Sequence, residues 1–401
     1  MKLEINGRVI VASPGDSIYR AAKQAGINIP GLCTSDHLNP FGSCRLCLCE
    51  VEGQSGTPAS CTTPVREGMV VHTESERLTR LRKHLLELYL SEQPAGDRVP
   101  EPLQALARSL GLTHVRYLQP AGRVPVVDRS NPFFVFDNAV CISCARCVLA
   151  CDEIQGTHAL TMLYRGFSSR PAAGAAALSG EAAGFASSNC VSCGACVKEC
   201  PTGALIEKTV LEEGEPMQTV RTTCAYCGVG CTFDAGVREG RVVRMVPADD
   251  GPSNHGHACM KGRFGWTYNY APDRLRTPLL RQGDKWVELS WPAALDRIAE
   301  EWSRIKEAHG PDALATISSS RGTNEENYLF GKFMRCVIGS NHIDNCARVC
   351  HSATVTGMME TLGASAATNS IQDLDLAKLI LVVGANPTES HPVLGARIKQ
   401  A

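Results

Sequence analysis

The sequence predicts a multidomain protein that is α+β over its first part and α/β beyond about residue 270. Its 401 residues are 44% hydrophobic and 20% charged, a composition that suits a globular protein of about two to four domains. The chain contains 20 cysteines, most of them in closely spaced sets. After residue 270, helical and strand-like stretches alternate, which is typical of a mainly parallel sheet covered by helices.

The apolar pattern of the first part predicts two strands around a tight turn and three helices. Asn6 and Gly7 form a pair that supplies the positive φ angles of a hairpin turn. The strands are expected at 3–5 and 8–11, and the helices at 17–25, 77–90 and 101–110. Residues 171–187 are rich in alanine and glycine and predict a loop between two cysteine sets.

The last part begins with a helix whose start is marked by Ser290 and by a proline in the first turn. The expected elements are, in order, helix 291–309, strand 313–319, helix 325–338, helix 352–362 and a buried strand at 378–383 that ends at Gly384. The chain stops in the helix expected after that strand, so we expect it to be a piece of a longer protein.

Charge and hydropathy exclude several classes of partner. Lys plus Arg number 40 and Asp plus Glu number 41, giving a net charge of -1, so no broad field favours nucleic acid or an anionic membrane. No apolar stretch approaches the length of a membrane span, and the first residues lack a secretory signal. We therefore expect a cytoplasmic protein, in which close cysteine sets are more often metal ligands than disulfides.

The first cysteine set is Cys33, Cys44, Cys47 and Cys61, with intervals of 10, 2 and 13 residues. Four thiolates on a Gly/Pro-rich loop and one distant segment can surround a small iron-sulfur cluster while backbone amides bond the sulfides. Cys49 is interpreted as a thiol that is not a ligand. The long first interval resembles the N-terminal [2Fe-2S] domain of complex I large subunits, certain hydrogenases and certain formate dehydrogenases, which implies a β-grasp ferredoxin-like domain.

The second and third sets share the pattern C-x2-C-x2-C-x3-C. In two-cluster ferredoxins the fourth cysteine of one run binds the cluster held by the other. A zinc site is the alternative, but the repeated triple spacing and the trailing Cys200-Pro201 favour two [4Fe-4S] clusters. The predicted ligands are Cys141, Cys144, Cys147 and Cys200 for one cluster, and Cys190, Cys193, Cys196 and Cys151 for the other.

The fourth set is Cys224, Cys227, Cys231 and Cys259, followed after one residue by Lys261. Zinc is a genuine competitor here, because two close cysteine turns separated by a long loop also occur in zinc ribbons. The pattern C-x2-C-x3-C-x27-C-x-K resembles the start of catalytic subunits of the molybdopterin oxidoreductase superfamily. That resemblance favours a third [4Fe-4S] cluster.

The order of these parts resembles the catalytic subunit of a formate dehydrogenase. The motifs that carry the resemblance are NCARVCHSATVTG at 345–357, TNEENYLFGKFMR at 323–335 and VVGANPTESHP at 382–392. In that family a cysteine or selenocysteine followed by histidine binds molybdenum or tungsten. Here the pair is Cys350 and His351, whereas related nitrate reductases typically place methionine after the cysteine.

The resemblance implies roles for further residues. Cys350 is expected to bind the metal. The alternative is that Cys350 is a buried core thiol, which is what we expect of Cys336 and Cys346. His351 is expected to orient formate or to relay a proton, since an unperturbed imidazole titrates close to neutral pH. Lys261 is expected between the fourth cluster and a pterin. The residues expected to bind the guanine dinucleotide of one pterin are Gly384, Asn386, Pro387 and His391.

The implied cofactors are one [2Fe-2S] cluster, three [4Fe-4S] clusters, and molybdenum or tungsten with two molybdopterin guanine dinucleotides. The implied partners are formate and carbon dioxide, with either a diaphorase-type subunit carrying flavin and NAD, or ferredoxin. Relatives usually hold one more cluster in a His-x3-Cys-x2-Cys-x5-Cys segment. Here the interval from Cys61 to Cys141 contains no cysteine, so that cluster cannot form, and His84 is expected on a helix surface.

These inferences predict a reversible formate dehydrogenase that passes two electrons through iron-sulfur clusters. The alternatives are an electron-transfer module similar to a complex I large subunit, or a truncated iron-sulfur scaffold without substrate chemistry. The predicted domains are 1–76 with [2Fe-2S], 77–132 as a helical connector, 133–215 with two [4Fe-4S] clusters, 216–275 with one [4Fe-4S] cluster, and 276–401 as a partial molybdopterin-binding domain.

Overall fold

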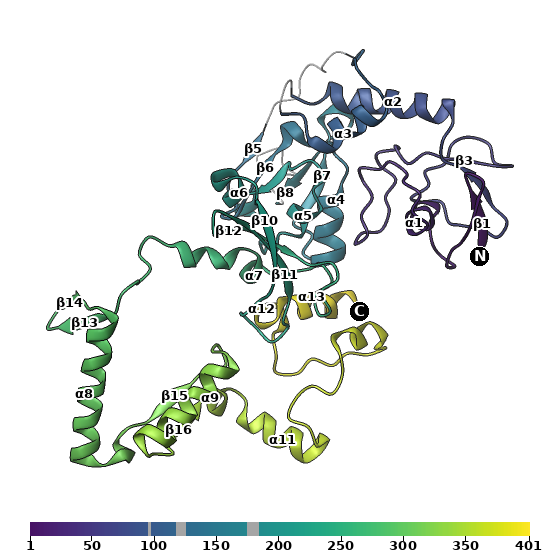
Figure 1. Cartoon of the computed structure of the whole chain (residues 1–401). Coiled ribbons are helices and arrows are strands. Elements are labelled where there is room, and N and C mark those ends of the chain that lie inside the picture. Colours follow the sequence, from purple (N-terminus) through teal and green to yellow (C-terminus); the bar gives the residue numbers. More distant parts are fainter. Residues whose placement is uncertain (95–97, 118–125, 175–183) are drawn as a thin grey trace. The chain divides into compact units, whose positions relative to one another are not determined.

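The chain divides into two compact units, one of residues Met1–Phe264 with Asp375–Ala401 and the other of Gly265–Leu374. The computed structural model describes residues 1–94, 98–117, 126–174 and 184–401 (Figure 1). In these ranges, no helix combines the length and the apolar character that crossing a membrane requires.

The first unit begins with a four-stranded sheet of order β2-β1-β4-β3, in which β1 and β4 are parallel. Asn6 and Gly7 take positive φ angles of 51° and 76° between β1 and β2, so the predicted hairpin is confirmed. Ser17 caps helix α1, because its Oγ accepts from the Arg20 amide. Ile5, Ile18 and other apolar side chains fill the core between helix and sheet. The elements are β1 Lys2–Ile5, β2 Arg8–Val11, α1 Ile18–Gln24, β3 Glu50–Val51 and β4 Val70–His72.

Two helices follow, α2 at Glu76–Ser91 and α3 at Glu101–Ser109. They match the helices predicted at 77–90 and 101–110. Leu86 of α2 and Leu103 of α3 are fully buried in one core, while His84 is half-buried on α2.

Arg82 fastens α2 to the loop that carries the first cysteine set. Its buried guanidinium donates from Nε to the carbonyl oxygen of Leu46 at 2.9 Å, from Nη1 to that of Thr73 at 2.9 Å, and from Nη2 to that of Leu48 at 2.7 Å. Hydrogen bonds from a charged donor are stronger than neutral ones, and a buried carbonyl without a partner is costly. Arg82 therefore connects the helix directly to the backbone around Cys47.

The middle of the first unit consists of short elements around the second and third cysteine sets. Phe134 lies at its centre and meets Phe185 edge to face at 5.0 Å. The strands are β5 Val127–Asp128, β6 Phe134–Asp137 and β9 Leu205–Glu207 in one sheet, with β7 Leu160–Leu163 and β8 Arg170–Ala173 in another. The helices are α4 Arg146–Leu149, a π-helix Ala150–Gln155 and α5 Ala195–Glu199.

The predicted loop at 171–187 is only partly described. Residues 170–173 form β8, which pairs antiparallel with β7, so this end of the loop prediction is wrong. Residues 170–173 form a strand because their backbone bonds to β7. The composition of the segment does not reveal this pairing. Residues 175–183 lie outside the described ranges.

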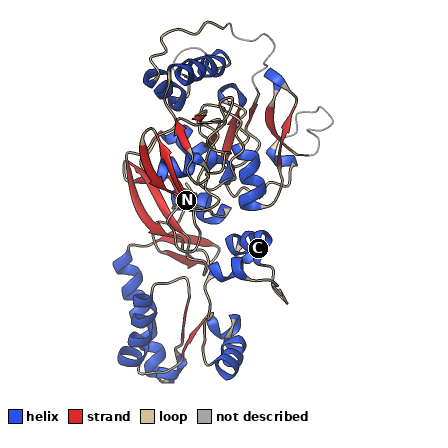
Figure 2. Ribbon diagram, turned by 90° about the vertical axis from the view of Figure 1, so that its right-hand side faces the viewer, coloured by secondary structure: helices blue, strands red, loops and turns tan. Residues whose placement is uncertain are grey.

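The rest of the first unit is an antiparallel sheet of order β10-β11-β12 with flanking helices (Figure 2). The C-terminal helix returns to this unit, since Lys399 Nζ donates to the carbonyl oxygen of Gln155 at 2.7 Å and Gln400 Nε2 to that of Ile154 at 2.7 Å. The elements are α6 Lys208–Glu213, β10 Gln218–Thr223, β11 Thr232–Arg238, β12 Arg241–Pro247, α7 Met260–Phe264, α12 Pro387–Ser390 and α13 Pro392–Gln400.

The second unit has a small core of Leu314, Met334 and Ile338. Ser290 caps α8 as predicted. Thr323 and Glu326 form a reciprocal capping box at the start of α9. The elements are β13 Leu279–Gln282, β14 Lys285–Glu288, α8 Trp291–His309, β15 Thr316–Ser318, α9 Asn324–Phe333, a π-helix Met334–Ile338, β16 Ile343–Asn345, α10 Ala347–Cys350 and α11 Ser352–Leu362.

Two predictions for the last part differ from the structure. Residues 378–383 form no strand, and Leu379 and Leu381 are 88% and 83% exposed. A short apolar run becomes a strand only where a neighbouring strand pairs with it, which its composition cannot show. The expected mainly parallel sheet is, in the described part of the second unit, a single parallel pair of β15 with β16.

Replacing Arg82 with methionine should destabilise the N-terminal sheet region by about 2–4 kcal/mol, because three charge-assisted hydrogen bonds are lost and three carbonyls lose their donor. Urea unfolding followed by circular dichroism measures the change. Arg80→Met, at an exposed position of the same helix, is the matched control and should stay within about 0.5 kcal/mol of the parent. Equal losses in both variants would show that the contacts of Arg82 contribute nothing.

Candidate metal centres

The first cysteine set is gathered in loops beside α1 and β3. All four thiols are buried, and Sγ of Cys47 lies 3.3 Å from Sγ of Cys61. Backbone amides point at sulfur, since Leu32 donates to Cys44 Sγ at 3.4 Å and the Cys44 amide donates to Cys33 Sγ at 3.3 Å. The hydrogen bond from Cys33, followed by the Leu32 amide, lowers the pKa of Cys44 to about 5 against the effect of burial. Buried thiols with amide donors fit an iron-sulfur cluster.

Cys49 is buried next to this set but turns to a different partner. Its Sγ contacts the carbonyl oxygen of Pro58 at 3.6 Å. Burial, and then the charge of Cys47, raises the pKa of Cys49 to about 12. Cys49 is therefore engaged with Pro58, and its interpretation as a non-ligand stays a prediction.

The second and third sets lie in two loops with the same backbone. Ser143 and Ser192, each two residues after the first cysteine of its run, have φ angles of 51° and 53°. Ala145 and Gly194, each directly after the second cysteine, have φ angles of 63° and 75°. These left-handed residues turn amides towards sulfur, as in the 3.4 Å and 3.3 Å contacts of the two serine amides with the first cysteine of each run. Such a concave arrangement of amides favours anionic groups.

The fourth cysteine of each run lies beside the opposite set. The charge of Cys200 acts on Cys144, whose pKa is raised to about 12, mainly by burial. The charge of Cys151 acts on Cys193, whose pKa burial likewise raises to about 12. Close thiolates repel one another, which raises their pKa until a metal neutralises them. The placement agrees with the exchange of ligands predicted for two [4Fe-4S] clusters.

The fourth set surrounds a small hollow between β11 and α7. Burial raises the pKa of Cys231 to about 12, and the charges of the other three members of its set act in the same direction. Gly262 is required there, because a Cβ would lie 2.8 Å from the ring of Phe233 and 3.1 Å from Sγ of Cys224. The thiols of each set are neighbours, although within the described ranges no three His, Cys, Asp or Glu side chains meet as around a single metal ion.

Lys261 lies at the edge of this hollow together with the C-terminal segment. Its Nζ donates to the carbonyl oxygen of Glu389 at 3.4 Å. Asn386 precedes α12 and bonds Glu389 through its side chain, and Gly384 adopts a left-handed φ of 64°. The structure thus brings Lys261 close to the segment of the predicted pterin-binding residues, Gly384, Asn386, Pro387 and His391.

Arg263, which sequence reasoning missed, connects the third and fourth sets. Its amide donates to the carbonyl oxygen of Cys259 at 3.2 Å, and its buried guanidinium pairs with Glu207 at 2.9 Å. The side chain passes directly over Gly194, where a Cβ would meet Arg263 Cδ and Nε at less than van der Waals distance. The positive charge of Arg263 opposes the increase in the pKa of Cys193 and Cys196. No local motif indicates such a contact, because Arg263 lies 56 positions along the chain from Glu207 and still further from Gly194.

Cys350 and His351 lie at the junction of α10 and α11 in the second unit, and both side chains are exposed. Cys336 and Cys346 are exposed too, so their prediction as core thiols is wrong. The small core of this unit consists of Leu314, Met334 and Ile338. Cys346 lies outside this core and directly precedes α10. The Ser320 hydroxyl and amide, which lie 3.4 and 3.3 Å from Cys346 Sγ, lower the pKa of Cys346.

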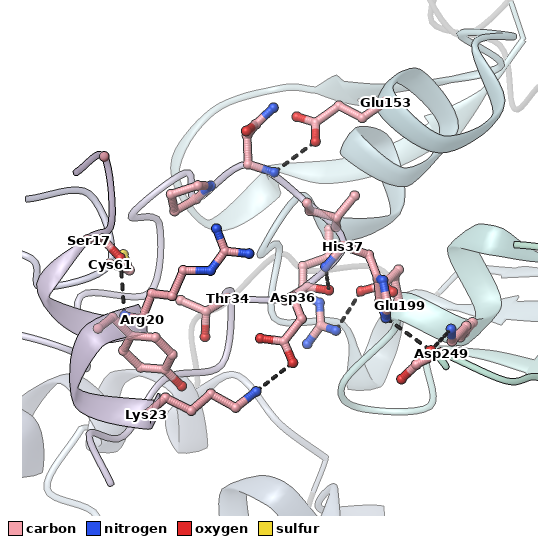
Figure 3. Close-up of a pocket in the computed structure, with 18 residues that line it drawn as sticks. Ser17, Arg20, Lys23, Thr34, Asp36, His37, Cys61, Glu153, Glu199 and Asp249 are labelled. Atoms are coloured by element: carbon pink, nitrogen blue, oxygen red, sulfur yellow. Dashed lines mark hydrogen bonds and ion pairs between the residues drawn. The ribbon is translucent and has the colours of Figure 1, made fainter. Parts of the chain in front are cut away.

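A polar cavity of about 590 Å³, which the sequence did not predict, borders Cys61 of the first set (Figure 3). An ion pair and a hydrogen bond cross it between the loop at 34–40 and later parts of the first unit. His37 contacts Asp249 at 3.0 Å, and the Asn39 amide donates to Glu153 at 2.8 Å. Lys198 also pairs with Asp249. These contacts connect the loop of the first set to the region of the second and third sets.

Replacing Cys47 with serine should remove the first cluster, whereas Cys49→Ser should keep it. The reason is that only Cys47 belongs to the converging set, while Cys49 faces Pro58. Iron analysis and electron paramagnetic resonance (EPR) of anaerobically prepared protein measure the outcome, with a loss of about two iron atoms per chain for Cys47→Ser alone. Loss of the same signal in Cys49→Ser would contradict the ligand set.

Replacing Gly194 with alanine should disturb the third set, because the new Cβ would overlap the side chain of Arg263. We expect a loss of about 2–4 kcal/mol in stability together with iron loss. Gly203→Ala is the matched control, since Gly203 also has a positive φ but has no atom within 4 Å of its Cβ position; it should cost only about 1–2 kcal/mol. Equal iron loss in the two variants would argue against the role of this contact.

Four family models match successive parts of the chain. They are the 2Fe-2S iron-sulfur cluster binding domain at 1–76, the 4Fe-4S dicluster domain at 140–204, the molybdopterin oxidoreductase Fe4S4 domain at 217–271 and molybdopterin oxidoreductase at 274–401. The predicted fold class and order of domains are thereby confirmed.

Two curated relatives have provisional names. YjgC of Bacillus subtilis, named as an oxidoreductase, is 31% identical over 100% of this chain and 44% of its own length. A Staphylococcus aureus protein, provisionally named a formate dehydrogenase, is 30% identical over 99% of this chain and 44% of its own length. The chain thus spans less than half the length of these relatives.

Two solved structures are similar to parts of the chain. An NAD+-reducing [NiFe]-hydrogenase in the H2-reduced state is 32% identical, with a TM-score of 0.46, over 52% of this chain and 87% of the hydrogenase chain. Acetylene hydratase from Pelobacter acetylenicus is 25% identical, with a TM-score of 0.32, over 35% of this chain and 20% of its own. Both TM-scores are below 0.5, so neither likeness establishes a shared overall fold. The four matches show [2Fe-2S] and [4Fe-4S] domains ahead of a molybdopterin oxidoreductase domain at 274–401.

Proposed function

We propose that the chain is part of the catalytic subunit of a cytoplasmic, molybdopterin-dependent formate dehydrogenase. Formate would be oxidised to carbon dioxide with release of one proton and two electrons, and the reaction would be reversible. The observation that carries the proposal is Cys350 followed directly by His351 in a chain with molybdopterin oxidoreductase domains. The name of the Staphylococcus aureus relative adds support.

Cys350 would be the soft protein ligand of molybdenum or tungsten, since thiolates suit such metals. When bound with two molybdopterin guanine dinucleotides, the metal would supply a two-electron acceptor for the hydride equivalent of formate. His351 would orient the formate carboxylate or hold the proton, because an imidazole can exchange protons near neutral pH.

Lys261 would stabilise charge between the fourth cluster and a pterin. Its contact with Glu389 supports this role, because it brings a cation to both the fourth set and the segment proposed to bind the guanine dinucleotide. That segment begins with a left-handed glycine and a helix start, whose amides suit phosphate groups. The proposed binding residues are Gly384, Asn386, Pro387 and His391.

Electrons would leave through the cysteine sets, beginning with the fourth and continuing through the third and second. The buried thiols and their amide donors support one [2Fe-2S] and three [4Fe-4S] clusters. The final acceptor would be NAD, through a diaphorase-type flavin subunit, or ferredoxin.

The second candidate is an electron-transfer module related to complex I large subunits, or a scaffold without substrate chemistry. The observation that favours it is the exposure of the side chains of Cys350 and His351. Metal analysis separates the candidates, because the alternatives would contain iron but neither molybdenum nor tungsten.

Replacing Cys350 with alanine should abolish formate-dependent dye reduction in anaerobically purified protein. The iron content should stay at about 14 atoms per chain, since the four cysteine sets are unchanged. Molybdenum or tungsten bound per chain should fall together with activity, because the soft ligand is removed.

Cys336→Ala is the matched control, because Cys336 is another exposed thiol of the same unit but has no role in the proposed site. It should retain both metal and turnover. Formate turnover that persists in Cys350→Ala would refute the ligand role, and a parent protein without molybdenum or tungsten would favour the second candidate.

A further inference from the structure

The helices α2 and α3 pack against two cysteine sets at once. One hydrophobic core contains Cys33 and Cys44 of the first set, Cys144 of the second, and the fully buried Leu86 and Leu103 of the two helices. A shared core means that packed side chains, rather than solvent, occupy the space between the two sets. This core lies where the sequence lacks the cysteines of a further cluster.

The residues next to the ligands also belong to this core. Leu32 precedes Cys33 and donates its amide to Cys44 Sγ, Leu46 lies between Cys44 and Cys47, and Ile142 follows Cys141. Each is buried, so the loops of the two sets approach one another through apolar side chains. The contact is thus made by the ligand loops themselves as well as by the helices.

Tyr89 of α2 packs into the same core. Burial raises the pKa of its hydroxyl, and the charges of Cys44, Cys33 and Cys144 act in the same direction. The phenol is therefore within electrostatic reach of both sets. The hydrogen bonds from Arg82 to the carbonyl oxygens of Leu46 and Leu48 hold this side of the first set against α2.

We propose that the clusters of the first and second cysteine sets exchange electrons directly across the α2–α3 core, with Tyr89 as the positioning residue that fills the path. The proposal rests on the cluster assignment of the proposed function and not on its substrate. One electron leaves one cluster and enters the other. No covalent bond forms or breaks, and no proton is transferred. Electron transfer slows steeply with distance and across solvent gaps, so a packed core in place of a missing cluster keeps the two centres in communication.

The test uses anaerobically purified protein in which dithionite, rather than formate, reduces the clusters. In the parent protein, EPR should show the [2Fe-2S] signal broadened and relaxing faster because a paramagnetic [4Fe-4S] cluster is nearby. Rapid photoreduction with freeze-quench EPR then gives the rate of equilibration between the two centres. Tyr89→Ala should slow this rate severalfold at unchanged iron content, because it opens a cavity in the path. Tyr89→Phe should leave the rate unchanged, because the ring remains.

Tyr19→Ala is the matched control, since Tyr19 packs on the core of the N-terminal sheet and not on the α2–α3 core. It should leave the rate unchanged. With full iron content, an uncoupled [2Fe-2S] signal in the parent, or an unaltered rate in Tyr89→Ala, would overturn the proposal. If Tyr89→Ala loses iron, Tyr89→Leu replaces it with the same expected slowing. A parent protein without iron would instead refute the cluster assignment of the proposed function.

Discussion

Burial of cysteine thiols beside one another is the constraint on which the rest of the first unit depends. Burial disfavours thiolates and so do neighbouring like charges, which is why the pKa of Cys147 and of Cys196 lies well above its ordinary value. Metal binding removes this cost, because it needs thiolates and neutralises them. The surrounding loops are shaped for that state, because left-handed residues turn amides towards sulfur and Arg82 of α2 bonds the backbone on both sides of Cys47.

Local patterns predicted what local interactions determine. The hairpin at Asn6 and Gly7 follows from turn geometry, and α8 begins where Ser290 can cap it. The four cysteine sets could be recognised in the sequence because each lies mostly within one or two loops. Cysteines that are close along the chain are therefore also close in space. The order of domains followed from the order of these sets and from the family resemblance that they carry.

Interactions between distant segments could not be predicted in this way. The pairing of Arg263 with Glu207, and its passage over Gly194, depend on how two loops meet. The exposed run at 378–383 has the composition of a buried strand, but its backbone is not paired with another strand. Cys346 was expected in a core because thiols are often buried, yet it precedes a helix and contacts Ser320. In each case the decisive partner lies elsewhere in the chain.

The N-terminal sheet region contacts the rest of its unit through two different interfaces. One is the apolar core of α2 and α3. The other consists of ion pairs around an open cavity, in which Asp249, with 64% of its side chain exposed, receives both His37 and Lys198. Ion pairs with a solvent-exposed partner are screened by salt, whereas apolar packing is not. Rising ionic strength would therefore weaken the polar interface first. The N-terminal part would then rotate about the apolar interface. The cavity would widen, while Cys44 and Cys144 kept their separation.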